Sequence, residues 1–163
     1  TPYGGLAWPL RLACSCQTVS MEREDLIRRA QRVNAAWNTH DPLNVAVLFT
    51  PECTTRESGQ RPAQHGRQAI VRRAQMYFRA FVDFDSRLAA VNADGSMCFS
   101  RWVAVGTHTG ELHGLAPTGR RVEIEGCSVY EFDPNGYIQS ETVYWDQGAL
   151  LRELGAIDPG LLG

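Results

Sequence analysis

The C-terminal half of this 163-residue chain constrains the fold most, because it carries three long runs of strand-like residues separated by turn signals. These runs lie within residues 97–146, and Asp133-Pro134-Asn135-Gly136 is a typical hairpin turn between the last two. A shorter strand is expected over residues 84–93. Long strands that follow a helical N-terminal half predict a curved sheet wrapped around helices. That architecture encloses one internal pocket.

The N-terminal half predicts three helices. Ser20 is expected to cap the first, whose apolar residues recur at helical spacing: Ile27, Ala30, Val33 and Trp37. Asp41-Pro42 reads as an N-cap and first helical position, opening a short helix through Phe49. The third helix is expected over residues 68–81. Strands are expected at 51–57, 84–93, 96–112, 120–132 and 137–146, with a last helix at 147–154.

The expected fold class is therefore α+β, with a curved antiparallel sheet wrapped around N-terminal helices to form a cone. Residues 20–156 form the predicted domain, between an irregular arm (1–19) and a C-terminal tail (157–163). The outer face of the sheet is unusually apolar for a solvated surface, which predicts a homodimer or homotetramer. The residues behind this prediction are Val103, Val105, Val129 and Val143.

Composition excludes several classes of function. The formal charge is -2 with acids and bases interleaved, so a nucleic-acid partner is not expected, and no apolar run suits a membrane span. All sixteen basic residues are arginine, which excludes lysine Schiff-base chemistry. The five scattered cysteines favour reduced thiols and a cytoplasmic location. The histidines and cysteines lack metal-ligand spacing, so neither a metal nor another cofactor is predicted.

Four segments carry a resemblance to a known family: Trp37-Asn38-Thr39-His40-Asp41, residues 106–111, residues 114–122, and Tyr144-Trp145-Asp146 with residues 150–155. Over about residues 20–156 the chain resembles the SnoaL-like polyketide and ester cyclases of the nuclear-transport-factor-2-like superfamily. The resemblance implies ring closure by intramolecular aldol condensation without a cofactor. It also implies an acid/base aspartate late in the last strand and a histidine in the strand before. Here Ser128 stands near the expected histidine, and one register places Val143 at the aspartate position.

Three residues are candidate catalytic groups. Asp146, beside two aromatic residues, is either a desolvated base or the cap of the following helix. Glu141 has the strand parity of Val143, opposite to Asp146, so only one of the two acids is expected to point into the cone. His108 is either a general acid or enolate hydrogen-bond donor, or a residue of a subunit interface.

The pocket is expected to be lined by aromatic and hydroxyl side chains that bind the substrate: Trp37, Tyr77, Trp102, Ser128, Tyr130 and Trp145. The first hypothesis is an enzyme that abstracts a proton next to a carbonyl of an apolar, carbonyl-rich small molecule, followed by ring closure or isomerisation. The second is epoxide opening on the same fold, for which limonene-epoxide-hydrolase relatives pair two aspartates with an arginine. The third is a non-catalytic module for ligand binding or oligomerisation.

Overall fold

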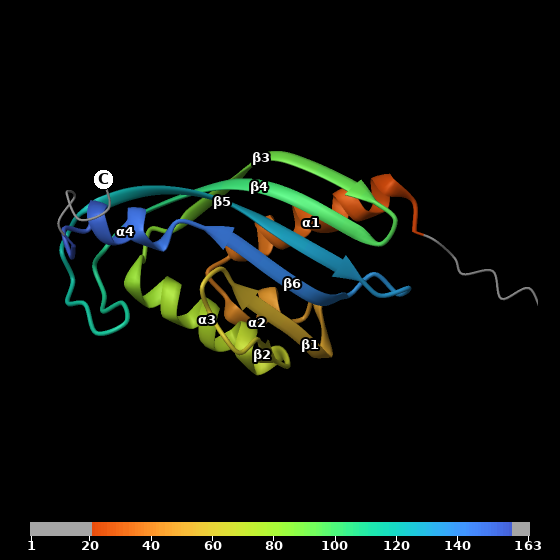
Figure 1. Cartoon of the computed structure of the whole chain (residues 1–163), viewed down its shortest axis with the longest axis horizontal. Helices are drawn as coiled ribbons and strands as arrows, with labels where there is room; N and C mark the ends of the chain where they lie inside the picture. The colour runs from red at the N-terminus through yellow and green to blue at the C-terminus, as the bar shows by residue number, and fades with distance from the viewer. Residues whose placement is uncertain (1–20, 158–163) are drawn as a thin grey trace, which may run out of the picture.

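The computed structural model describes residues 21–157 and confirms the α+β class. The predicted arm, the cap at Ser20, Cys14 and Cys16 lie outside these residues. A curved sheet wraps around helices that cover its inner face, as Figure 1 shows. The helices are α1 (Arg23–Trp37), α2 (Pro42–Ala46), α3 (Arg67–Ala80) and α4 (Gln147–Glu153).

The helices form where their apolar spacing and caps predict. In α1, Leu26, Ala30 and Val33 are buried at helical spacing, and the helix begins after Glu22. The Asp41 carboxylate accepts a hydrogen bond from the Leu43 amide at 2.8 Å, which confirms the predicted cap of α2. That helix is shorter than predicted, because the chain is extended again from residue 49 onwards.

The sheet has six strands in the order β2-β1-β6-β5-β4-β3. Their bounds are β1 Phe49–Glu57, β2 Gln64–His65, β3 Asp85–Asp94, β4 Met97–Thr107, β5 Arg121–Phe132 and β6 Ile138–Trp145. Strands β3 to β6 form the predicted antiparallel series. The sheet as a whole is mixed, because β1 pairs with β6 in parallel. Between β1 and β6 the chain forms β2, α3 and the strands β3 to β5. It then enters β6 beside β1 and in the same direction.

Strand β4 is shorter than predicted and ends at Thr107. The segment that follows leaves the sheet, because the Thr109 amide donates to the Ala80 carbonyl at the end of α3 at 2.9 Å. The His108 amide donates to the Arg120 carbonyl, also at 2.9 Å. This hydrogen bond joins the two ends of the loop formed by residues 108–120. The two-residue strand β2 lies in a segment for which the sequence predicts no strand, and it pairs with Thr54 and Thr55.

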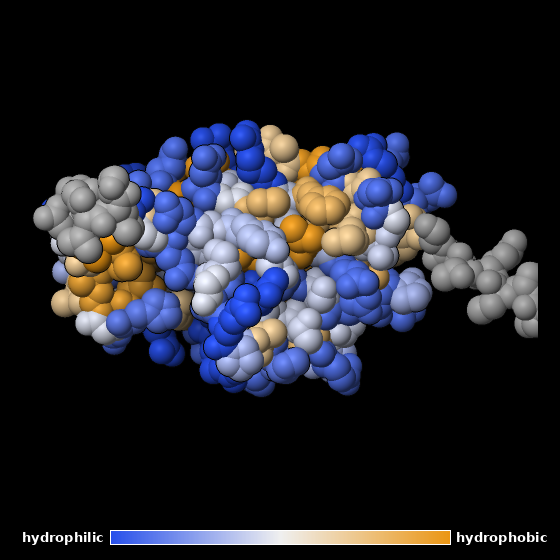
Figure 2. All heavy atoms as spheres, viewed as in Figure 1, coloured by the Kyte–Doolittle hydropathy of each residue, from blue (hydrophilic) through white to orange (hydrophobic). Residues whose placement is uncertain are grey.

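The faces of β6 settle which of its acids points inward. Glu141 and Val143 are buried on the inner face, whereas Tyr144 is 49% exposed on the outer face. Val143 was therefore wrongly predicted to lie on the outer face, and Val105 also reaches the inner cavity. Exposed Phe99 of β4 lies on the outer face, where Figure 2 shows hydrophobic side chains among hydrophilic ones. A dimer or tetramer through this face stays a prediction.

Three of the five cysteines lie in the described part of the chain. Cys53 and Cys98 are buried and free, and Cys127 is free and half-buried. Burial raises the pKa of the Cys98 thiol to about 11, so this thiol is protonated and unreactive at neutral pH.

Within residues 21–157, every helix is too short or too polar to span a bilayer.

Candidate functional site

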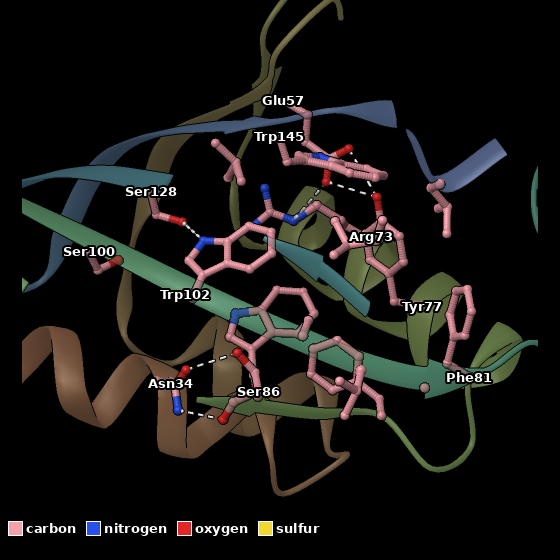
Figure 3. Close-up of a pocket in the computed structure, with 18 of the residues that line it drawn as sticks. Asn34, Glu57, Arg73, Tyr77, Phe81, Ser86, Ser100, Trp102, Ser128 and Trp145 are labelled. Atoms are coloured by element: carbon pink, nitrogen blue, oxygen red, sulfur yellow. Dashed lines mark hydrogen bonds and ion pairs between the residues drawn. The ribbon is translucent and has the colours of Figure 1, made fainter. Parts of the chain in front are cut away.

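One cavity of about 130 Å³ lies between the helices and the inner face of the sheet. Its walls come from α1, α3, α4 and strands β1 and β3 to β6. Figure 3 shows the labelled side chains pointing into it. The residues predicted to line the pocket all do so: Trp37, Tyr77, Trp102, Ser128, Tyr130 and Trp145. That they bind a substrate stays a prediction.

Hydroxyl and indole groups occupy one side of the cavity. The indole nitrogen Nε1 of Trp102 donates to the Ser128 hydroxyl at 3.0 Å. The Ser100 hydroxyl is buried without a hydrogen-bond partner among the described residues. Burial, reinforced by the negative charge of Glu141, raises the pKa of the Tyr130 hydroxyl, which is therefore protonated. These groups can donate hydrogen bonds to oxygen atoms of a ligand.

Glycine at position 126 makes this arrangement possible. A Cβ atom there would lie 2.5 Å from the Trp102 ring and 2.8 Å from the Tyr144 carbonyl oxygen. The missing side chain lets the indole cross the face of β5 and reach Ser128.

An arginine and a carboxylate form the opposite wall. Tyr77 of α3 donates through its hydroxyl to both carboxylate oxygens of Glu57, at 3.2 and 3.1 Å. The Arg73 Nε atom lies 3.9 Å from the same carboxylate, and the guanidinium also stands 5.6 Å from the centre of the Trp37 ring. All four residues line the cavity, and Figure 3 shows Glu57, Arg73 and Tyr77 converging.

Glu141 lies behind this wall rather than on the cavity surface. Its Oε2 atom accepts from Arg73 Nη2 at 2.5 Å and from the Thr55 hydroxyl at 2.8 Å. Arg73 Nη1 also donates to Thr55 at 2.7 Å. The Glu141 side chain is only 2% exposed. Two buried carboxylates, Glu57 and Glu141, therefore share one guanidinium.

Burial and neighbouring charges shift the pKa values of Glu57, Tyr77 and Arg73. Burial raises the pKa of Glu57 above its usual value, although Arg73 and the Tyr77 hydroxyl oppose the shift. Burial and then the charge of Glu57 raise the pKa of Tyr77, so its hydroxyl is protonated. Burial alone would lower the pKa of Arg73, but the two carboxylates outweigh it and keep the guanidinium charged. The wall thus combines a buried carboxylate of raised pKa with two groups that stay protonated and can donate hydrogen bonds, the Tyr77 hydroxyl and the Arg73 guanidinium.

The sequence interpretation missed Glu57, Arg73 and Ser100. Two signals could have found the charged pair. Cys53, Thr55 and Glu57 alternate on the buried face of β1, and Arg73 lies three residues after Ile70 and four before Tyr77 on the apolar side of α3. A charged residue at a position that periodicity assigns to the core is a candidate functional group.

The structure places Asp146 outside the cavity. Its carboxylate accepts from the Ala149 amide at 2.9 Å and pairs with Arg152 at 3.2 Å, so it caps α4. The Ala149 hydrogen bond, followed by Arg152, lowers the pKa of this exposed carboxylate. A lowered pKa is the opposite of what desolvation would produce, so the capping interpretation is favoured over the base interpretation.

The variant Asp146→Asn is expected to keep wild-type turnover, because asparagine caps helices as well as aspartate does. Asp146→Ala should lower the melting temperature without changing turnover. The depressed pKa implies a stabilising contribution that is present above the pKa of the unfolded chain and lost as the pH falls. Melting temperature and turnover of both variants check this. A folded Asp146→Asn protein without turnover would show that the Asp146 carboxylate takes part in catalysis.

His108 also lies outside the cavity. It is fully buried, its ring centre stands 5.5 Å from that of Phe81, and Phe81 faces the cavity. Its Nδ1 atom accepts from the Thr118 amide at 3.2 Å, which holds the loop after β4, while its Nε2 atom has no partner among the described residues. The position favours a structural role. None of the three predicted catalytic residues, Asp146, Glu141 and His108, is on the cavity surface.

Comparison with solved structures supports the fold. AclR from Streptomyces galilaeus, described as a proposed hydroxylase, is 21% identical, with a TM-score of 0.74 over 84% of this chain and 100% of its own. A proposed SnoaL-like polyketide cyclase from Jannaschia sp. CCS1 is 14% identical, with a TM-score of 0.75 over 83% and 95%. An LEH-like epoxide hydrolase from M. tuberculosis is 18% identical, with a TM-score of 0.64 over 83% and 93%.

These identities show a shared fold and leave the reaction open. The search of curated proteins found no match. The family model described as SnoaL-like polyketide cyclase matches residues 27–154, which include both walls of the cavity. The chain therefore belongs to the SnoaL-like polyketide cyclase family.

Proposed function

We propose that this protein is a cofactor-independent enzyme that abstracts a proton next to a carbonyl of an apolar small molecule. Intramolecular aldol-type ring closure or isomerisation would follow. The observation that carries the proposal is Glu57, a buried carboxylate on the cavity surface whose pKa is raised by burial and which Tyr77 holds in place. A cavity with an inward carboxylate favours catalysis over a non-catalytic binding module.

In the proposed mechanism Glu57 is the general base. It takes a proton from the carbon next to the carbonyl, and negative charge develops on the carbonyl oxygen. Protonation of Glu57 frees the Tyr77 hydroxyl to donate to that oxygen, and the adjacent Arg73 guanidinium stabilises the same charge. The enolate carbon then attacks a second carbonyl of the folded substrate. Glu57 returns its proton to the new alkoxide, so the enzyme ends in its starting state.

Deuterium exchange tests this proposal without requiring the natural substrate. Apolar diketones and polyketide-like esters incubated with the enzyme in D2O are expected to gain deuterium at the carbon between the carbonyls, as followed by mass spectrometry. Glu57→Gln should reduce the exchange rate to the rate without enzyme, and Asp146→Asn should retain the enzyme-catalysed rate. Exchange that proceeds equally fast with Glu57→Gln would contradict the assignment of the base.

Epoxide opening is the alternative, and one observation favours it: Arg73 stands between two carboxylates, Glu57 and Glu141. In this reaction a carboxylate would activate water and a second group would protonate the epoxide oxygen. The LEH-like epoxide hydrolase noted above has the same fold. Turnover in H2¹⁸O separates the two reactions. Hydrolysis leaves the label in the diol product, whereas aldol-type closure forms its new bond between carbons.

A further inference from the structure

A second cleft lies on the other side of the charged wall. It has a volume of about 460 Å³ and shares Glu57 and Arg73 with the apolar cavity. Its lining differs in character, because Arg56, Arg61 and Arg72 line it together with His113. Figure 2 shows strongly hydrophilic side chains where Figure 1 places β1, β2 and α3, the elements around this cleft.

The arginines of this cleft are not neutralised. Among residues 21–157, Arg56, Arg61 and Arg72 make no ion pair and no side-chain hydrogen bond. The single carboxylate in the lining is Glu57, which is already hydrogen-bonded to Tyr77 and, at 3.2 Å, to Gln60. This positive surface stands out on a chain whose formal charge is -2.

We propose that the cleft lined by Arg56, Arg61, Arg72 and His113 binds an oxyanion, a phosphate or carboxylate group. Guanidinium groups present paired N–H donors that match the oxygens of such groups. Like charges that line one cleft without a counter-ion repel one another, and a bound anion relieves that repulsion. His113, on the loop after β4, lines the same cleft as these arginines and Glu57.

The position of the cleft suggests a substrate class, and this step rests on the proposed function. A ligand with an apolar body in the cavity and an acidic group in the cleft would straddle Glu57 and Arg73. The acidic group would then position the ligand for proton abstraction by Glu57, so the substrate would be an amphipathic carbonyl compound rather than a wholly apolar one.

Isothermal titration calorimetry with inorganic phosphate and, separately, succinate tests the cleft itself. Sodium chloride at matched ionic strength is the reference. We expect saturable binding of at least one of the two anions at a single site. Arg61→Gln and Arg72→Gln are expected to weaken it by about 10-fold or more each, as for a lost hydrogen bond to a charged group. Both residues are exposed, and melting temperatures verify that the variants fold.

Arg87→Gln is the matched control, since Arg87 is an exposed arginine of β3 outside both cavities. Binding of phosphate alone identifies a phosphate site, and binding of succinate alone identifies a carboxylate site. Heats equal to those of sodium chloride for both anions would overturn the inference. So would binding that Arg87→Gln weakens as much as Arg72→Gln does. Glu57→Gln separates the two proposals. It should abolish the enzyme-catalysed proton exchange, whereas anion binding should be at least as tight as in the wild type, because the variant removes the single carboxylate of the cleft.

Discussion

Replacing Arg73 by methionine is expected to lower the free energy of unfolding by about 3–5 kcal/mol, the usual cost of leaving a buried charge without its partner. Arg73 is 10% exposed, and its carboxylate partners Glu57 and Glu141 are 4% and 2% exposed. Removing the guanidinium leaves the Glu57 and Glu141 carboxylates buried without a positively charged partner. Urea unfolding of the wild type and the variant measures the loss.

Two controls sharpen this experiment. Arg121→Met removes an ion pair with Asp83 whose side chains are 62% and 42% exposed, and such surface pairs contribute about 0–1 kcal/mol. The double variant Arg73→Met/Glu141→Gln removes one of the stranded charges, so it should be more stable than Arg73→Met alone. An Arg73→Met protein as stable as Arg121→Met would mean that water solvates this wall, contrary to the burial described above.

The second large effect concerns catalysis. Glu57→Gln is expected to reduce kcat by about 10²–10⁴-fold, the usual contribution of a general base. The amide has nearly the same shape and still accepts a hydrogen bond from Tyr77, so KM should change little. Steady-state kinetics on a substrate found by deuterium exchange measure both constants. Glu52→Gln is the matched control, because Glu52 is an exposed glutamate on the same strand.

The pH dependence follows from the raised pKa of Glu57. The carboxylate must be deprotonated to act as a base, so kcat/KM should rise with pH through a pKa above the usual 4.5. Between 4.5 and this raised value the native protein binds more protons at residue 57 than the unfolded chain does. Stability therefore falls as the pH rises through this window. Glu57→Gln should lose both trends, and it should be at least as stable as the wild type at pH 7.

A loss of kcat without a loss of stability in Glu57→Gln distinguishes a catalytic carboxylate from a structural one. If Glu57 served the fold alone, its replacement would lower stability and leave the turnover of the remaining folded protein unchanged. A Glu57→Gln variant with wild-type kcat and an unaltered pH profile would refute the proposed mechanism.

Much of the fold was predictable because local rules and tertiary packing agree in this chain. The strands of residues 85–107 and 121–145, the hairpin turn at 133–136 and the cap at Asp41 lie close to where the sequence places them. The aromatic lining was also predictable, because strand parity and helix spacing decide which side chains face inward. The parallel pairing of β1 with β6 was not, since nothing local to β1 specifies its neighbour.

The catalytic assignments show the limit of that reasoning. The sequence points to Asp146 through its two aromatic neighbours and to His108 through its place in a family-like segment. Each has a local hydrogen-bond partner, the Ala149 amide for Asp146 and the Thr118 amide for His108. A charged or imidazole group that finds a nearby partner serves the local structure, and sequence alone cannot weigh that partner against a distant cavity.

The sequence by itself determined the α+β class, the family and an aromatic pocket, because these depend on periodicity and on side chains that follow one another along the chain. Only the tertiary structure decided which acid faces the pocket. Glu57, Arg73 and Glu141 come from β1, α3 and β6, and burial alters the pKa of Glu57 only after these elements meet. Desolvation and pairing of charges are properties of the assembled wall, so the chemistry of this site arises from packing.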